Sequence, residues 1–317
     1  MAVYRIGDVL RMKREALGIT REKLCEMSGD ICSVQTLYRM ECGKVKVKQE
    51  VYRKLMECMG ELPERRYASI VVSEYQALNL KPKIHQYLRY KEFEQAEETL
   101  EQLERVMDRN YVRNKQYLKE IKLYISYCRG EISAEEYWKD LWECLRHTIP
   151  SLDNIDLDRW PYNCEEFDIL ADMVTAYCDM KLPEKELCLL EQLKNNAEKK
   201  YMEQDYYITW HSYILGELSR VMSTTNQHEK SIEYCNQGIE ELKNQRLLSN
   251  MPCLLYDLAW NKEQLMKKGM AEKKEREFCK KLLVQAYYLN VAQKEVYNPE
   301  RIKKLCERYF PGEITYF

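Results

Sequence analysis

Apolar residues between positions 5 and 60 recur at spacings of three and four, in short runs separated by polar and glycine-containing breaks. This spacing is typical of amphipathic helices, whose apolar side chains must share one face. Helices are predicted over about residues 6–17, 20–28, 33–42 and 48–59. The pattern therefore predicts a small bundle of four or five short helices in this region.

Cap residues define the boundaries of the second and third of these helices. Thr20 and Ser33 each stand just before an apolar run, where a hydroxyl oxygen can accept a hydrogen bond from a backbone N–H of the first turn. Gly43 follows the third helix, at a position where a positive φ is favoured. Two short helices joined by a tight turn are thus expected between Thr20 and Gly43.

Beyond about residue 67 the pattern changes to longer amphipathic helices that come in pairs. Similar segments begin near Glu92, Ser133, Pro183, His228 and Glu272, at spacings of about 41, 50, 45 and 44 residues. Their companion helices are expected near residues 68–80, 110–128, 164–180, 205–222 and 251–268. A repeating helix pair of this length is typical of a solenoid. Residues 146–163, which contain two prolines, are expected to form a hinge or a long connection.

Composition supports an almost entirely helical chain. Of 317 residues only 10 are glycine and 8 are proline, the residues that interrupt helices, whereas Leu, Lys and Glu are abundant. We therefore predict an all-α protein. Residues 1–64 are expected to form a five-helix helix-turn-helix domain, and residues 65–317 an α-solenoid of tetratricopeptide-like helix pairs.

Charge differs between the two predicted domains. Residues 1–66 contain 14 Lys and Arg against 10 Asp and Glu, whereas the remaining residues contain 36 against 42. A basic module on an acidic body is expected when only the first part binds DNA, although this excess is modest. The 13 cysteines include no Cys-x-x-Cys pair, and neither a secretion signal nor a long apolar run is found. A cytoplasmic protein without structural disulfides is expected.

The third helix carries side chains suited to sequence-specific DNA recognition. A recognition helix enters the major groove with its N-terminal residues against base edges, where Gln pairs with adenine and Arg with guanine. Gln35 and Arg39 are four residues apart and share a face, which Ser33 and Tyr38 flank. The basic residues expected to contact phosphates are Arg11, Arg21, Lys44 and Lys46. A polar helix face alone would fit an ordinary small bundle, so the interpretation depends on the ordered combination.

Residues from about 5 to 60 resemble the helix-turn-helix domain of the phage repressor and Cro family, also called the XRE family. The resemblance rests on IGDVLRMKREALGITREKLCEMSG and then SVQTLYRMECGK. It implies an ion pair between Arg14 and Glu41, which ties the first helix to the third. It also implies DNA-backbone contacts from Thr20 and Arg21, and a groove-facing surface of Ser33, Val34, Gln35, Tyr38 and Arg39. The departures are Cys25, where the family usually has alanine, and an apparent extra residue in the turn.

The whole arrangement resembles the peptide-pheromone-responsive regulators of Gram-positive bacteria, the Rgg- and PlcR-like group. This resemblance rests on architecture and length, because those proteins join the same module to a C-terminal tetratricopeptide-like domain. It implies a homodimer that binds a double-stranded DNA operator. It also implies a short signalling peptide bound in the concave face of the repeats.

The first helices of two late repeats provide candidates for such a peptide site. Solenoids expose a concave face lined by the first helix of each pair, where amide and aromatic side chains can bind a peptide. The candidates are Tyr206, Trp210, Tyr213, Glu217, Tyr256, Trp260 and Asn261. Aromatic residues at helical spacing also form the core between repeats, so each candidate has a structural interpretation as well.

No catalytic motif accompanies these features. The sequence lacks the phosphate-binding and nucleophile motifs of common enzymes, and its four histidines lie apart, without metal-ligand spacing. Its carboxylates, as in EEFD at 165–168, are interpreted as solvated helix faces. We therefore expect a transcription regulator without enzymatic activity, cofactor, metal or membrane association. The alternative is a protein-interaction adaptor whose repeats bind a protein partner, with DNA binding auxiliary.

Overall fold

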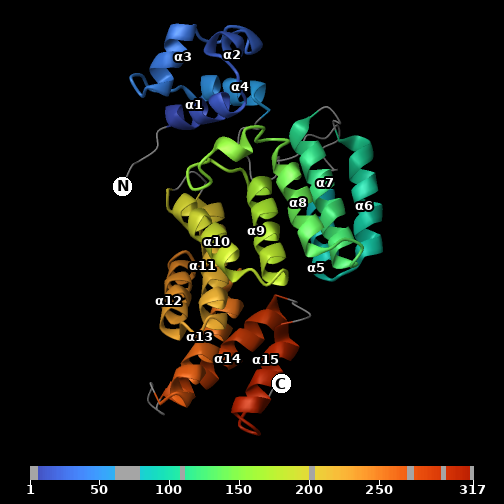
Figure 1. Ribbon diagram of the computed structural model, residues 1–317, viewed down its shortest axis with the longest axis vertical. Coiled ribbons are helices and arrows are strands. Elements are labelled where there is room, and N and C mark those ends of the chain that lie inside the picture. The colour runs from blue at the N-terminus through green and yellow to red at the C-terminus, as the bar shows by residue number, and fades with distance from the viewer. Residues whose placement is uncertain are drawn as a thin grey trace. The chain divides into compact units, whose positions relative to one another are not determined.

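The computed structural model describes residues 6–60, 79–107, 111–199, 204–269, 275–293 and 298–314, without the side chains of residues 49, 204–206, 298 and 299. All regular structure within these ranges is helical, as the sequence predicts (Figure 1). The chain divides into two compact units, Met1–Leu182 and Pro183–Phe317. The predicted domain boundary at residue 64 lies outside the described ranges and remains a prediction.

Four short helices form the amino-terminal bundle: α1 (Ile6–Ala16), α2 (Arg21–Met27), α3 (Val34–Glu41) and α4 (Gln49–Cys58). Leu10, Leu24, Leu37 and Leu55 are fully buried at its centre. Each helix contributes one of these leucines, so a single apolar cluster holds the bundle together. Four or five helices are expected between residues 5 and 60, and the described residues 6–60 contain four.

The first unit continues with repeat helices: α5 (Leu80–Arg89), α6 (Phe93–Val106), α7 (Val112–Cys128), α8 (Ala134–Leu145) and α9 (Cys164–Asp179). Here α5 packs against α6, α7 against α8, and α8 against α9 (Figure 1). Ile84, Leu100, Leu103 and Tyr117 lie at the centre of one apolar core. The helix expected near 68–80 falls almost wholly outside the described residues, and the unpredicted α5 is the partner of α6.

Residues 146–163 form a long connection, interrupted by one 3-10 turn, η2 (Leu152–Asn154). Trp160 in this connection is buried, and Lys13 Nζ of α1 lies 4.5 Å from the centre of its ring. The same lysine nitrogen lies 3.6 Å from Glu166 Oε2 in the first turn of α9. The connection is therefore packed into the first unit, because Lys13 of α1 contacts both its Trp160 and Glu166 of α9.

The second unit contains α10 (Pro183–Glu198), α11 (Gln204–Thr224), α12 (His228–Asn244), α13 (Met251–Lys267), α14 (Glu275–Ala292) and α15 (Asn298–Tyr309). Each helix packs against the next, and α11 also contacts α13. Cys235, Leu254, Leu283 and Phe310 are buried in the common core. The apolar pattern of the sequence did not predict α15. Among the described helices, none has the length and apolarity needed to cross a membrane.

Candidate DNA-recognition surface and ligand pocket

Local capping fixes the start of both helices in the helix-turn-helix. Thr20 Oγ1 accepts a hydrogen bond from the backbone N–H of Lys23, and Ser33 Oγ accepts one from that of Thr36, each at 3.2 Å. The predicted caps are confirmed. They satisfy N–H groups that the first turn of a helix leaves without intrahelical partners. Both hydroxyl-bearing residues remain exposed at the surface, as a contact with DNA would require.

The backbone turns sharply on either side of α3. Gly29 and Asp30, in the turn before it, both have positive φ, at 67° and 53°. Asp tolerates this left-handed conformation better than most residues, which is how the longer turn is accommodated. Gly43, with a φ of 64°, follows α3 at the position predicted for it.

Three charged residues form a buried network behind α3. Glu41 is 0% exposed, and its carboxylate accepts hydrogen bonds from Arg14 Nε at 2.6 Å and from Arg14 Nη2 at 3.0 Å. Arg21 Nε donates to the same carboxylate at 2.6 Å. Burial alone would lower the pKa of Arg14, but the hydrogen bonds and charge of Glu41 raise it overall. The structure thus contains the Arg14–Glu41 pair implied by the family resemblance, with Arg21 as a further partner.

A close backbone contact fixes α1 against α3. A Cβ atom added at Gly7 would lie 1.9 Å from the carbonyl oxygen of Met40. Only glycine allows this approach, since a larger side chain would push the two helices apart. The contact lies beside Glu41, so the buried network and the helix contact together orient α3.

The outer face of α3 presents polar side chains. Gln35 and Arg39 are exposed, and Tyr38 is 43% exposed between them. Val34, also predicted to face the groove, is half-buried and packs against the core of the bundle. Gln35 and Arg39 thus lie on one side of the helix. The Gln amide can donate to and accept from adenine, and the Arg guanidinium can donate to guanine, in the major groove.

Tyr38 forms a platform beneath two cations, a feature that sequence reasoning missed. The guanidinium carbon of Arg21 lies 5.3 Å from the centre of its ring, and Lys44 Nζ lies 5.5 Å from it. Cation–π contacts of this kind hold long basic side chains in place. Lys46 is exposed after α3, whereas Arg11 lies on α1, 3.6 Å from Asp8. The basic residues predicted to contact phosphates thus come from α1, from α2 and from the segment after α3.

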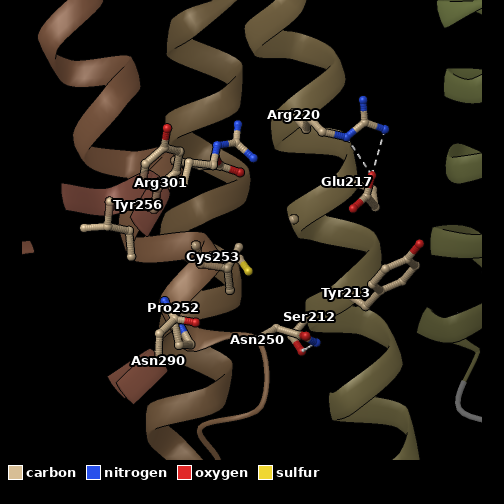
Figure 2. Close-up of a pocket in the computed structure, with 14 residues that line it drawn as sticks. Ser212, Tyr213, Glu217, Arg220, Asn250, Pro252, Cys253, Tyr256, Asn290 and Arg301 are labelled. Atoms are coloured by element: carbon tan, nitrogen blue, oxygen red, sulfur yellow. Dashed lines mark hydrogen bonds and ion pairs between the residues drawn. The ribbon is translucent and has the colours of Figure 1, made fainter. Parts of the chain in front are cut away.

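A second candidate site is a pocket of about 310 Å³ in the second unit. It is lined by Ser212, Tyr213, Gly216, Glu217, Arg220, Asn250, Pro252, Cys253, Leu254, Tyr256, Asp257, Asn290, Arg301 and Ile302. Figure 2 shows Glu217 and Arg220 on one side of the pocket and Tyr256 and Arg301 on the other. Its volume is at the lower end of the range typical of small-ligand sites.

Three of the seven predicted peptide-binding residues line this pocket: Tyr213, Glu217 and Tyr256. Trp210 and Trp260 are not lining residues, and their rings pack edge-on against Tyr213 and His228.

Asn261 is also absent from the pocket lining. It is fully buried, donates to the carbonyl of Asp257 at 2.8 Å, and accepts from Ser223 Oγ at 3.0 Å. The side chain of Tyr206 lies outside the described residues. Asn261 therefore has the structural role that the sequence analysis left open for each candidate.

Several lining residues were not predicted. Arg220 lies three residues after the predicted Glu217 on α11, so helical spacing could have indicated it. Asp257 directly follows Tyr256 on α13, and adjacent residues point to different faces of a helix, so spacing alone did not indicate it. Asn290 and Arg301 come from α14 and the start of α15, and only the packing of these helices brings them to the pocket. No local sequence signal marks these two residues.

Charges in the pocket are unevenly compensated. Arg220 Nε donates to Glu217 Oε2 at 2.8 Å, and its guanidinium also binds Glu186. The guanidinium of Arg301 lies 5.1 Å from the centre of the Tyr256 ring. Burial, followed by the charge of Glu217, raises the pKa of Asp257 to about 7, although Arg301 and Arg220 oppose the shift.

The interpretation of the EEFD segment as a solvated face is wrong. Glu165 and Glu166 are 1% and 0% exposed. Lys81 Nζ and Arg113 Nη2 donate to Glu165 at 2.6 and 2.7 Å, so cations from α5 and α7 compensate its charge. Burial raises the pKa of the neighbouring Asp168 to about 8. Sequence spacing did not reveal this because these partners come from distant helices.

Within the described residues, no cluster of His, Cys, Asp and Glu could hold a metal ion.

Comparison with known families supports the reading of the amino-terminal module. Residues 10–65 match the family model described as Helix-turn-helix. This segment contains both caps, the turn, α3 and the buried glutamate, so the module is a helix-turn-helix domain of the XRE type. No curated protein sequence matches the chain.

Solved structures with a similar fold span nearly the whole chain. PlcR of Bacillus thuringiensis in complex with the peptide PapR7 and DNA is 15% identical, with a TM-score of 0.59 over 94% of this chain and 98% of that chain. Its apo form is 11% identical, with a TM-score of 0.55 over 93% and 98%. ComR of S. thermophilus in complex with DNA and its signalling peptide ComS is 16% identical, with a TM-score of 0.51 over 96% and 99%. At these identities the similarity establishes a shared fold, a helix-turn-helix domain followed by helical repeats.

Proposed function

We propose that this protein is a DNA-binding transcription regulator whose repeat domain senses a short peptide. Residues 1–64 bind an operator in double-stranded DNA, and residues 65–317 bind the ligand and form a homodimer in the cytoplasm. The observation that carries the proposal is the exposed pair Gln35 and Arg39, on a helix that the buried Arg14–Glu41–Arg21 network holds in place. The proposed activity is binding rather than catalysis.

Different residues of this surface would contact the bases and the backbone of DNA. Gln35 and Arg39 make hydrogen bonds to base edges, each bidentate pair contributing about 1–3 kcal/mol of discrimination. The residues that contact the sugar-phosphate backbone and position α3 without reading sequence are Thr20, Arg11, Arg21, Lys44 and Lys46. Ser33 and Tyr38 flank the base-reading pair in the groove. In a homodimer two copies of α3 would enter successive major grooves about 34 Å apart, so the operator is expected to be palindromic.

Peptide control is supported by the pocket and by the solved structures of similar fold, two of which contain both a peptide and DNA. A peptide changes DNA affinity only if it binds one dimer geometry more tightly than another. A peptide in the pocket would contact α11, α13 and α15 at once, so its affinity would depend on the relative positions of these helices. Two dimer geometries that differ in these positions would then bind the peptide with different affinities.

The proposal is tested by selecting binding sites from a random pool of duplexes with the full chain, and by measuring affinity for the selected site by fluorescence anisotropy. We expect the double substitution Gln35→Ala and Arg39→Ala to reduce that affinity at least tenfold. Gln102→Ala with Arg105→Ala is the matched control, because both residues are exposed on α6. Recovery of no consensus site, together with a stoichiometric protein partner, would favour the adaptor alternative.

A further inference from the structure

One carboxylate in the pocket has no cation bound to it. Asp257 lies on α13 and lines the pocket, yet within the described part of the chain no hydrogen bond or ion pair involves its carboxylate. Only its backbone carbonyl is engaged, by the amide of Asn261. Asp257 is partly buried, and a partly buried carboxylate without a partner costs free energy when it is ionised, so a ligand that supplies a cation would reduce that cost.

The two arginines of the pocket do not take this role. Arg220 binds Glu217 and Glu186, so two carboxylates already share its positive charge. Arg301 is exposed and lies over the ring of Tyr256, where water solvates its charge. Neither arginine of the pocket thus forms an ion pair with Asp257.

The rest of the lining suits a short peptide segment. Pro252, Leu254 and Ile302 are buried and provide apolar surface. Asn250, whose amide donates to Ser212 Oγ at 2.9 Å, adds polar groups at one end (Figure 2). A ligand with a charged end and an apolar side chain would match both features.

We propose that the pocket binds a primary ammonium group, either the free amino terminus or a lysine side chain of a peptide, with the Asp257 carboxylate as its counter-ion. This inference rests on the proposed peptide-sensing function and names the group that anchors the peptide. The ammonium donates hydrogen bonds to the carboxylate, and the adjoining side chain packs on Pro252, Leu254 and Ile302. Such a charge-assisted contact in a partly desolvated pocket is stronger than one between neutral groups.

The test uses four small probes, titrated at pH 7.5 against the full chain and followed by ligand-detected NMR. Alanyl-leucinamide has a free amino terminus, and Nα-acetyl-lysinamide has only the side-chain amine. Acetyl-alanyl-leucinamide is neutral, and acetyl-alanyl-leucine is anionic. The variants are Asp257→Asn, which keeps size and removes charge, and Glu240→Gln, a control at an exposed position on α12.

We expect at least one of the two amines to bind at least fivefold more tightly than the neutral probe, and the better one identifies the source of the ammonium. Asp257→Asn should reduce this preference to less than twofold, whereas Glu240→Gln should leave it unchanged. Equal binding of all probes, tightest binding of the anionic probe, or binding of none would overturn the proposal. Failure of the proposed regulator function would appear separately, as the absence of a consensus site in the DNA selection.

The pH dependence of binding gives a second readout. The charged groups facing Asp257 are Glu217 and Arg220 from α11 and Arg301 from α15. Since the pKa of Asp257 is raised to about 7, Nα-acetyl-lysinamide should bind more tightly as the pH rises from 6 to 8. The lysine amine stays protonated over this range. Affinity that is independent of pH in the wild type, or that varies equally in Asp257→Asn, would contradict the assignment.

Discussion

At the scale of single residues, the buried Glu41 holds the recognition helix against the rest of the module. It is fully buried and accepts hydrogen bonds from both Arg14 and Arg21, and Arg14 also donates to the carbonyl of Ile19 at 2.9 Å. One carboxylate therefore joins α1, α2 and α3, and Arg14 also ties α1 to the residue before the Thr20 cap. Removing its charge would leave two guanidinium groups facing a neutral partner, one of them almost fully buried.

We predict that Glu41→Gln lowers the free energy of unfolding of the helix-turn-helix domain by about 3 kcal/mol, because breaking a buried ion pair leaves a charge uncompensated. Chemical denaturation followed by circular dichroism measures this change. Glu15→Gln is the matched control, since Glu15 also binds Arg14, at 3.1 Å, but is exposed. Its effect should stay below about 1 kcal/mol. Equal effects of the two substitutions would show that the buried network does not stabilise the domain.

Removing the charge of Asp257 should stabilise the protein, in contrast to removing that of Glu41. Its pKa is raised from 3.8 to about 7 in the folded chain, so the folded state favours the protonated acid. Stability from this group is present at low pH and is lost as the pH rises from about 4 to 7, by at most about 4 kcal/mol. Asp257→Asn should therefore stabilise the protein more at pH 8 than at pH 5, by on the order of 1–2 kcal/mol in urea denaturation. A gain that is equal at both pH values would show that Asp257 is not desolvated.

At the scale of helices, the contact between α1 and α3 allows no side chain at Gly7. An added Cβ would lie 1.9 Å from Met40 O and 2.7 Å from Met40 C, both backbone atoms that cannot rotate away. The helix-turn-helix thus depends on close helix packing as well as on its buried charges. Gly216 in α11 differs, because a Cβ there would meet only Leu254 Cδ2, at 3.8 Å.

We predict that Gly7→Ala destabilises the helix-turn-helix domain by about 2 kcal/mol, the usual cost of overpacking, despite the better helix propensity of alanine. It should also weaken binding to the selected operator, since α3 is displaced. Gly216→Ala, the control, should be neutral or stabilising by up to about 1 kcal/mol. Thermal unfolding of both variants gives the comparison, and stabilisation by Gly7→Ala would mean that the two helices are further apart than described.

The helices themselves were largely predictable because their signals are local. Thr20, Ser33 and Gly43 mark boundaries through caps that depend on only a few neighbouring residues. The starts of α6, α8, α10, α12 and α14 lie within three residues of the predicted positions, because apolar spacing records the buried face of each helix.

Features set by contacts between distant helices were not predictable in the same way. Asn290 and Arg301 reach the pocket only because α14 and α15 pack where they do. Glu165 is buried because its cations come from Lys81 and Arg113, which lie 84 and 52 residues away in sequence. A single sequence holds the periodicity of each helix but no record of such pairings, so these sites required the structure.

At the scale of the whole molecule, the proposed regulator joins a DNA-reading module to a ligand-sensing repeat domain. Base-reading and phosphate-binding residues should then have separable effects. Substituting Lys44 and Lys46 with alanine should weaken binding to every sequence and reduce the salt dependence of affinity. Sequence discrimination should not change, because phosphates are the same at every site. Anisotropy titrations at several salt concentrations, on the selected operator and on a scrambled duplex, measure both quantities.

Recognition of DNA sequence by α3 is tested most directly by the ratio of affinities for the selected operator and for a scrambled duplex, measured at one salt concentration. We predict a ratio of at least about a thousand for the wild type. The pair Gln35→Ala and Arg39→Ala should lower it at least tenfold, and the pair Lys44→Ala and Lys46→Ala should leave it unchanged within a factor of about two. A ratio that survives the loss of Gln35 and Arg39 would contradict the assignment of α3 as the recognition helix.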